Sequence, residues 1–373
     1  MNQIAHHLYL YALSLELLGD KIATLRAVSV LFGVATVAVA YLFGREYGGR
    51  GWGLLLAFLV ASMRWHVNFS RIAMNGIDAP FFIFLSLYFA LRVLRGGPGQ
   101  LRAIAALGLS LGLGLNFYTA LRFFLVASIV FGLVLLIVRL HSRRRSRQPR
   151  QPTGNRSWLS PTICVGLLLV AVWLAAMPTV QYARRHSDSF FGRARRVSIF
   201  EPRQDPNLAR TLAQNTQKHL LMFNYKGDNN GCHNLPGVPT LDRFSAVLFA
   251  FGVGLAVARR DPVGLFFICL LLAGLLGGIL TLDFEAPQSL RSIGALPAVV
   301  SFIALSLDVL WLDLRRDVSA SGAAYHLVPV FLALGIIAFS NGLTYFGPQA
   351  HNPTVWAEFS AAETLVGKHI VEH

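Results

Sequence analysis

A single aspartate stands at the start of an apolar stretch, where its carboxylate could take part in chemistry. Asp78 lies two residues before Pro80 in the segment RWHVNFSRIAMNGIDAP, and the apolar stretch begins at Pro80. A carboxylate in such a partly dehydrated position can act as a general base that deprotonates an acceptor hydroxyl. The same side chain could cap a helix that opens at Pro80, and the two roles are compatible. We predict Asp78 as the catalytic residue.

Arginines near the ends of the apolar stretches could bind an anion. Arg71 lies in the same segment as Asp78. Arg122 follows Tyr118 in the tight turn FYTALR, and Arg291 lies in APQSLRSIGALP. Guanidinium groups at this depth suit a phosphate or diphosphate headgroup, which they can hold through two parallel hydrogen bonds. The alternative for each arginine is an interfacial anchor whose charged end reaches toward water. We predict that these three arginines and Tyr118 contribute to substrate binding.

A later segment, FNYKGDNNGCHNLPGVPTLD, is dense in Gly, Asn, Asp and Pro and predicts an ordered series of tight turns. We expect Asp228, Asn230, His233 and Asn234 to lie close together in it, and we predict that Asp228 and His233 contact the substrate, for example a sugar. The Asp-x-Asn spacing resembles the start of a calcium loop, but the downstream Glu of an EF-hand is absent. We therefore expect no cofactor, with a divalent cation as the weaker alternative.

These candidate residues lie between stretches of sequence that predict membrane helices. Of the 373 residues, 54% are hydrophobic and 14% are charged, and the mean hydropathy is +0.54. Soluble domains have about 45–50% apolar and about 25% charged residues. The apolar residues come in runs that are apolar on all sides, whereas helices of a soluble protein would each show one polar face. The net charge of +15 comes mostly from arginines between these runs, which indicates topology rather than nucleic-acid binding.

The pattern predicts an all-α polytopic membrane protein with about ten transmembrane helices. Their expected centres are residues 35, 57, 87, 109, 131, 169, 250, 272, 302 and 335. The stretch 51–63 is the shortest of them and runs into Arg64. Gly108 and Gly112 form a pair of small residues typical of helix packing.

Arginines in the short connections predict which side of the membrane each loop occupies, because such connections are cytoplasmic. Under strict alternation they fall on one side: Arg45, Arg50, Arg92, Arg95, Arg102, Arg143, Arg144, Arg145, Arg147, Arg150, Arg156, Arg259, Arg260, Arg315 and Arg316. We expect the transmembrane domain to span 25–345 and to include a long external loop, 178–241. Residues 1–24 should form an external segment with an interfacial helix, and 346–373 an external tail.

The order of several segments resembles a known family. ATLRAVSVLFGVATVAVAYLFGREYGG, WHVNFSRIAMNGIDAPFF and GLGLNFYTALRFF are followed by MFNYKGDNNGCHNLPGVPTLD and APQSLRSIGALPAV. Together they resemble the membrane glycosyltransferases of the GT-C superfamily, over roughly residues 8–312. The likeness is to the bacterial branch related to family 39 protein mannosyltransferases and to lipopolysaccharide-modifying glycosyltransferases.

The resemblance implies an inverting transfer of a sugar from a polyprenyl-phosphate donor to a lipid, glycan or protein acceptor. It also implies a multi-pass protein of the bacterial inner membrane with periplasmic loops and no nucleic-acid partner. Asp78 is similar to the second acidic position of the family. The first span and the loop with the first catalytic acid have no counterpart here, so residues 1–24 resemble a remnant of that loop. This predicts either a start further upstream or an impaired enzyme.

Two alternative functions belong to classes of protein other than enzymes. A lipid or solute transporter should carry ionisable groups near the middle of its spans, and these spans carry essentially none. A non-catalytic membrane scaffold or subunit is favoured if the N-terminal segment is truly missing.

Overall fold

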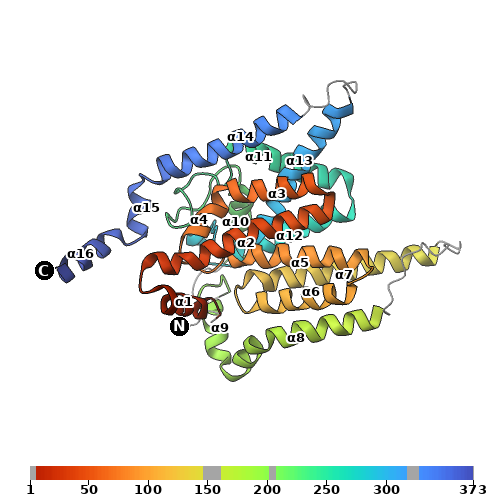
Figure 1. Cartoon of the computed structure of the whole chain (residues 1–373), viewed down its shortest axis with the longest axis horizontal. Helices are drawn as coiled ribbons and strands as arrows, with labels where there is room; N and C mark the ends of the chain where they lie inside the picture. Colours follow the sequence, from red (N-terminus) through yellow and green to blue (C-terminus); the bar gives the residue numbers. More distant parts are fainter. Residues whose placement is uncertain (1–5, 146–160, 201–206, 317–326, 373) are drawn as a thin grey trace.

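The computed structural model describes residues 6–145, 161–200, 207–316 and 327–372, and within these ranges the chain is helical (Figure 1). The long helices are α2 (Ile22–Gly48), α3 (Arg50–Ser62), α5 (Asp78–Arg95), α6 (Gln100–Leu115), α7 (Ala120–Arg145), α8 (Pro161–Arg185), α11 (Arg243–Arg259), α12 (Pro262–Ile279), α13 (Leu296–Arg316) and α14 (Leu327–Thr344). The shorter ones are α1 (His6–Leu18), α4 (Arg64–Arg71), α9 (Ser187–Arg196), α10 (Leu208–Leu221), α15 (Pro353–Glu358) and α16 (Ala361–Glu372).

Each of the ten predicted spans corresponds to one of the long helices. Five segments are long and apolar enough to cross a membrane by length and composition: 22–48, 162–185, 262–279, 293–311 and 328–349. Three shorter apolar helices lie at 50–62, 100–115 and 120–134. The predicted all-α polytopic membrane fold is therefore confirmed.

Glycines let several of these helices approach closely. A Cβ on Gly44 of α2 would lie 2.7 Å from the carbonyl oxygen of Trp52, and one on Gly53 of α3 would lie 2.8 Å from that of Tyr41. In the same way, a Cβ on Gly112 of α6 would lie 2.5 Å from the carbonyl oxygen of Val172 in α8. The predicted packing role of Gly108 and Gly112 is thus confirmed, with α8 as the partner helix.

The helices have two distinct ends. In Figure 1, α7 ends and α8 begins at the right of the molecule, and α13 ends and α14 begins at the upper right. The helices α1, α4, α9, α10 and α15 gather at the left. This agrees with the alternation that the arginine pattern predicts, because the segments predicted to be external lie at one end. We call this end the loop end.

Two features of the helices bear on the loop end. Helix α8 continues through Pro178 to Arg185, so the predicted long loop 178–241 begins as an extension of a helix. Asp242 caps α11 by accepting hydrogen bonds from the backbone N–H groups of Phe244 and Ser245. The turns of residues 224–241 therefore lead into a fixed helix start.

Candidate active site

A cavity of about 770 Å³ lies at the loop end. Its wall comes from α1, from the starts of α7 and α9, from the end of α8, and from the segments 197–200 and 288–291. Four residues that the sequence predicted for the site line it: Tyr118, Arg122, His233 and Arg291. Residues from distant parts of the chain thus line the same cavity.

Arg122 lies in the first turn of α7 and contributes a cation to the cavity wall. Its guanidinium carbon lies 4.6 Å from the centre of the Phe190 ring of α9, which is a cation–π contact. No hydrogen bond or ion pair joins the Arg122 side chain to the described residues. Its hydrogen-bond donors are therefore free to meet an anion in the cavity.

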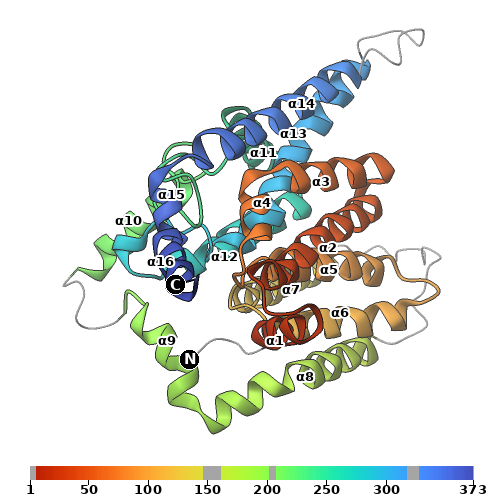
Figure 2. The ribbon, with the colours of Figure 1, turned by 60° about the vertical axis from the view of Figure 1, so that its left-hand side comes forward.

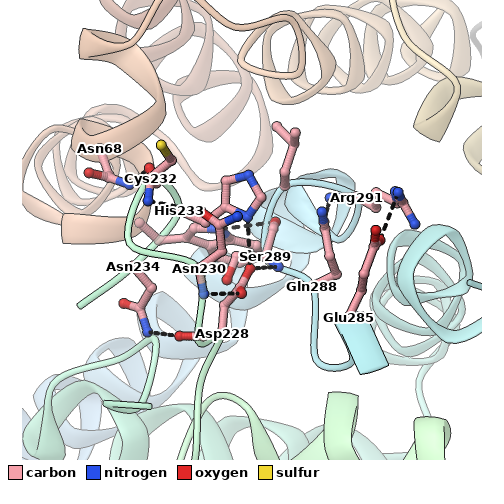
Figure 3. Close-up of polar contacts among 12 residues, drawn as sticks. Asn68, Asp228, Asn230, Cys232, His233, Asn234, Glu285, Gln288, Ser289 and Arg291 are labelled. Carbon is pink, nitrogen blue, oxygen red and sulfur yellow. Dashed lines mark hydrogen bonds and ion pairs between the residues drawn. The ribbon is translucent and has the colours of Figure 1, made fainter. Parts of the chain in front are cut away.

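Arg291 is held in place by its neighbours (Figure 3). Its Nη2 atom lies 2.8 Å from Oε2 of Glu285, and its backbone N–H donates to Oε1 of Gln288 at 2.7 Å. The backbone N–H of Gln288 in turn donates to Nε2 of His219 at 3.1 Å. Burial lowers the pKa of His219, which keeps that nitrogen available as an acceptor. The Nη1 atom of Arg291 is buried and has no hydrogen-bond partner among the described residues.

Asp228 and His233 form a carboxylate–imidazole pair (Figure 3). Oδ2 of Asp228 lies 3.0 Å from Nδ1 of His233 and accepts a hydrogen bond of 2.7 Å from the backbone N–H of Ser289. Oδ1 accepts a third one, of 2.9 Å, from the backbone N–H of Asn230. The predicted closeness of the polar residues in this loop is confirmed. Asp228 lies behind His233 and does not itself line the cavity.

Arg64, for which the sequence pattern predicts no role, holds the same loop in place. Its Nη1 atom donates to Oδ1 of Asn234 at 2.6 Å, and its Nη2 atom donates to the carbonyl oxygen of Pro239 at 2.7 Å. Burial lowers the pKa of Arg64 to about 10, so the side chain stays charged at neutral pH. A buried arginine that bridges two turns fixes their relative position. The position of Arg64 just after an apolar run was the available signal.

Asp78 is fully buried, with 0% of its surface exposed, rather than placed at a wet boundary. Its Oδ2 atom lies 3.0 Å from Nδ1 of His7, which is 1% exposed, and Oδ1 accepts from the backbone N–H of Gly76 at 3.2 Å. The carboxylate makes no capping bond to α5, so the alternative role as a helix cap is not realised. The charge of Asp78 adds to burial in raising the pKa of Tyr11 to about 12.

Arg71, a predicted site residue, and the buried His66 both lie apart from the cavity. Arg71, at the end of α4, donates a hydrogen bond of 2.5 Å to the hydroxyl of Tyr345 and stacks on its ring, so it faces the C-terminal side instead. His66 is buried on α4, and burial lowers its pKa to about 4. Among the described residues, His, Cys, Asp and Glu side chains form no group of three that could hold a metal ion.

Comparisons with known proteins give a family match over part of the chain. Residues 6–175 match the family model described as dolichyl-phosphate-mannose-protein mannosyltransferase. No curated protein matches the chain. The oligosaccharyltransferase AglB from Archaeoglobus fulgidus, in complex with an inhibitory peptide and a dolichol-phosphate, is 16% identical, with a TM-score of 0.45 over 91% of this chain and 47% of that one.

The apo form of the oligosaccharyltransferase from Archaeoglobus fulgidus is 17% identical, with a TM-score of 0.48 over 94% of this chain and 48% of that one. The chain thus spans about half the length of these two structures. The segment matched by the mannosyltransferase model runs from α1 into α8 and includes Asp78 and Arg122. This match covers slightly less than half of the chain, and it supports the resemblance to the GT-C membrane glycosyltransferases that the sequence shows.

Proposed function

We propose that the chain transfers a sugar from a polyprenyl-phosphate donor to an acceptor at the outer face of the cell membrane. The observation that carries this proposal is the cavity at the loop end, with the side chains of Arg122 and Arg291 in its wall. Under this proposal, residues 1–24, the loop 178–241 and the tail from 346 face the outside. The acceptor is a lipid, a glycan or a protein, and the description of the matched family favours a protein.

The phosphate of the donor would complete two unfinished sets of hydrogen bonds. The buried Nη1 of Arg291 has no acceptor among the described residues, and an unpaired buried donor costs about 1–3 kcal/mol. Because Arg291 lines the cavity, a small turn of its side chain would bring this atom to a bound phosphate. The Arg122 guanidinium meets the face of Phe190, which leaves its N–H groups for an oxygen ligand. Two guanidinium groups can spread the charge of a leaving phosphate without a metal, so we also propose that transfer needs no divalent cation.

The polyprenyl chain of the donor also has a suitable place. Helix α8 contributes Pro178, Thr179 and Tyr182 to the cavity wall, and only 11% of its apolar window is buried inside the protein. A membrane helix with so little protein around it contacts lipid. A donor could therefore lay its isoprene units along α8 while its phosphate enters the cavity.

Asp78 is the catalytic residue that the sequence pattern predicts, and its burial bears directly on that role. In the structure, Nδ1 of His7 lies within hydrogen-bond distance of one carboxylate oxygen of Asp78. Contact between Asp78 and an acceptor hydroxyl therefore requires α1 to draw away from α5 when the substrates bind. Replacing Asp78 with Asn tests this role, because unchanged sugar transfer would remove Asp78 from the mechanism.

Donor binding gives the direct test. The purified chain in lipid nanodiscs is titrated with a radiolabelled polyprenyl phosphate, and the variants Arg122→Gln and Arg291→Gln are compared with Arg102→Gln, an exposed residue of α6. Loss of one charge-assisted hydrogen bond costs about 1.5–3 kcal/mol, so we expect roughly 10- to 100-fold weaker binding for each site variant. Wild-type affinity in both site variants would contradict the proposed phosphate site.

Transfer itself is measured in proteoliposomes. The donor is a polyprenyl-phosphate hexose with a radiolabelled sugar, and a detergent extract of cell envelopes supplies the acceptor. We expect label to leave the organic-soluble donor at the same rate with and without EDTA. Movement of the intact donor across the bilayer without any transfer would instead support the transporter alternative and contradict the enzyme.

A further inference from the structure

Two carboxylate–imidazole pairs lie near the cavity, and they differ in access. In the first pair, His7 and Asp78, the other ring nitrogen of His7, Nε2, is buried and has no hydrogen-bond partner in the described part of the chain. In the second pair, His233 on Asp228, the imidazole lines the cavity. Its Nε2 makes no hydrogen bond to the described residues. Unlike Nε2 of His7, it is not fully buried. Solvent in the cavity can therefore reach Nε2 of His233.

The surroundings of Asp228 fix the protonation pattern of this imidazole. The carboxylate accepts hydrogen bonds from the backbone N–H groups of Asn230 and Ser289, which fix its position opposite the ring. An anion facing Nδ1 of His233 at 3.0 Å places the ring proton on that nitrogen. The lone pair then lies on Nε2, on the cavity side. A carboxylate that orients an imidazole in this way also stabilises the imidazolium that forms when the base takes a proton.

The same contacts tie the pair to the phosphate site. Ser289, which donates to Asp228, lies two residues before Arg291 in the segment that lines the cavity. Arg64 and Asn234 hold the other side of the loop, and the ring of Phe69 packs 5.6 Å from the ring of His233. His233 therefore stands on a rigid support that also carries Arg291, so the base and the phosphate ligand keep a fixed relative position, as catalysis requires.

We propose that His233 is a catalytic base of this chain and that Asp228 is its positioning residue. The inference rests on the proposed function. The acceptor hydroxyl oxygen attacks the anomeric carbon of the donor sugar, with inversion, and the bond from that carbon to the phosphate oxygen breaks. The polyprenyl phosphate leaves with the bonding electron pair. The hydroxyl proton moves to Nε2 of His233, which forms an imidazolium beside Asp228 and then releases the proton to water.

The test separates proton transfer from folding and from donor binding. His233→Gln keeps a polar side chain but cannot take a proton at neutral pH, so we expect at least a 100-fold slower transfer in the proteoliposome assay. Its affinity for the polyprenyl phosphate should stay within twofold of wild type. His233→Ala should lose transfer equally and regain at least a tenth of the wild-type rate when imidazole is added. The control variant is His351→Gln, which changes an exposed histidine outside the cavity wall. This variant should transfer the sugar at the wild-type rate.

Each outcome decides between the two proposals. A His233→Gln variant that keeps more than a tenth of the wild-type rate, or a His233→Ala variant that binds donor but gains nothing from imidazole, overturns the inference about the base. Failure of the wild-type chain to bind polyprenyl phosphate or to consume the donor overturns the proposed function itself. Imidazole rescue is the result that a merely structural role of His233 would not produce.

Discussion

His66 lies on α4 next to two residues that support the site. Arg64 donates to the carbonyl oxygen of Pro239, and the indole N–H of Trp65 donates to the carbonyl oxygen of Ser289 at 3.3 Å. His66 itself is 3% exposed, and its Nε2 has no hydrogen-bond partner among the described residues. The imidazole therefore belongs to the packed support of the cavity and would be costly to protonate there.

This burial predicts that the chain loses stability in acid. Burial lowers the pKa of His66 to about 4, whereas an exposed histidine has a pKa of about 6.5. Below about pH 6.5, His66 binds a proton in the unfolded chain but stays neutral in the folded chain until the pH nears 4. The stability present at neutral pH therefore falls as the pH drops from 6.5 to 4, by about 3 kcal/mol at the lower limit.

Thermal unfolding in detergent at pH 7 and pH 4.5 measures this effect. The variant His66→Gln should lose less stability between the two pH values than wild type, by about 2–3 kcal/mol. His219, whose pKa burial also lowers, contributes in the same direction and remains in both proteins. An equal loss in the variant and in wild type would show that His66 is not the titrating group.

At the residue scale, the sequence predicted the side chains that line the cavity better than those that hold them. Tyr118, Arg122 and Arg291 stand out because each lies at the end of an apolar run. The contacts of His7 and Arg64 could not be predicted, because their partners are 71 and 170 residues away along the chain. Only the fold brings such pairs together, so no local pattern could reveal them. The burial of Asp78 has the same origin, since α1 covers it.

At the element scale, the contact between α6 and α8 connects the cavity to the bundle. Helix α8 is mostly exposed and supplies part of the cavity wall, and α6 is one of the helices that it packs against. A Cβ at Gly108 would lie 2.5 Å from the Cβ of Ala171, so the two backbones are nearly in contact. Without this contact, Pro178 and Tyr182 would lose their positions in the wall.

We predict that Gly112→Val separates the two helices. A Cβ there meets the backbone of Val172 at 2.5 Å, and backbone cannot move aside as a flexible side chain can. We expect a loss of about 1–3 kcal/mol in stability and weaker binding of polyprenyl phosphate. Gly132→Val is the matched control, because Gly132 of α7 has no atom within 4 Å of the added Cβ. Similar melting temperatures for the two variants would contradict the packing argument.

The sequence predicted the helices themselves well, because a run that is apolar on all sides has few alternatives in a membrane. The exception is the end of α8. Pro178 was taken as the start of a loop, whereas the helix passes through it and reaches Arg185. A proline removes one hydrogen bond and bends a helix, but neighbouring helices can compensate for that loss. Next to the carbonyl of Leu174, which Pro178 leaves without its helical donor, Asn116 Nδ2 of the neighbouring segment donates to the carbonyl oxygen of Ala175 at 2.7 Å and ties this part of α8 to the bundle.

At the scale of the whole molecule, α8 and α14 form opposite edges of the bundle (Figure 2). Only 11% and 17% of their apolar windows are buried, whereas 78% of the window at 293–311 is buried. The bundle therefore has a protein core around α13 and two edges that face lipid. The loop end closes one side of this arrangement, so a headgroup in the cavity and an isoprene chain beside α8 would occupy the environments that each prefers.

The last prediction concerns which side of the membrane the loop end occupies. We expect Tyr225, 73% exposed in the turns after α10, to face the outside, and Leu101, 52% exposed at the start of α6, to face the cytoplasm. Each is replaced by cysteine in a chain whose Cys164, Cys232 and Cys269 are serine. A membrane-impermeant maleimide added to intact cells should label Tyr225→Cys and leave Leu101→Cys unlabelled until the cells are opened. The reverse pattern would show that the cavity lies on the cytoplasmic side. It would contradict a transfer at the outer face.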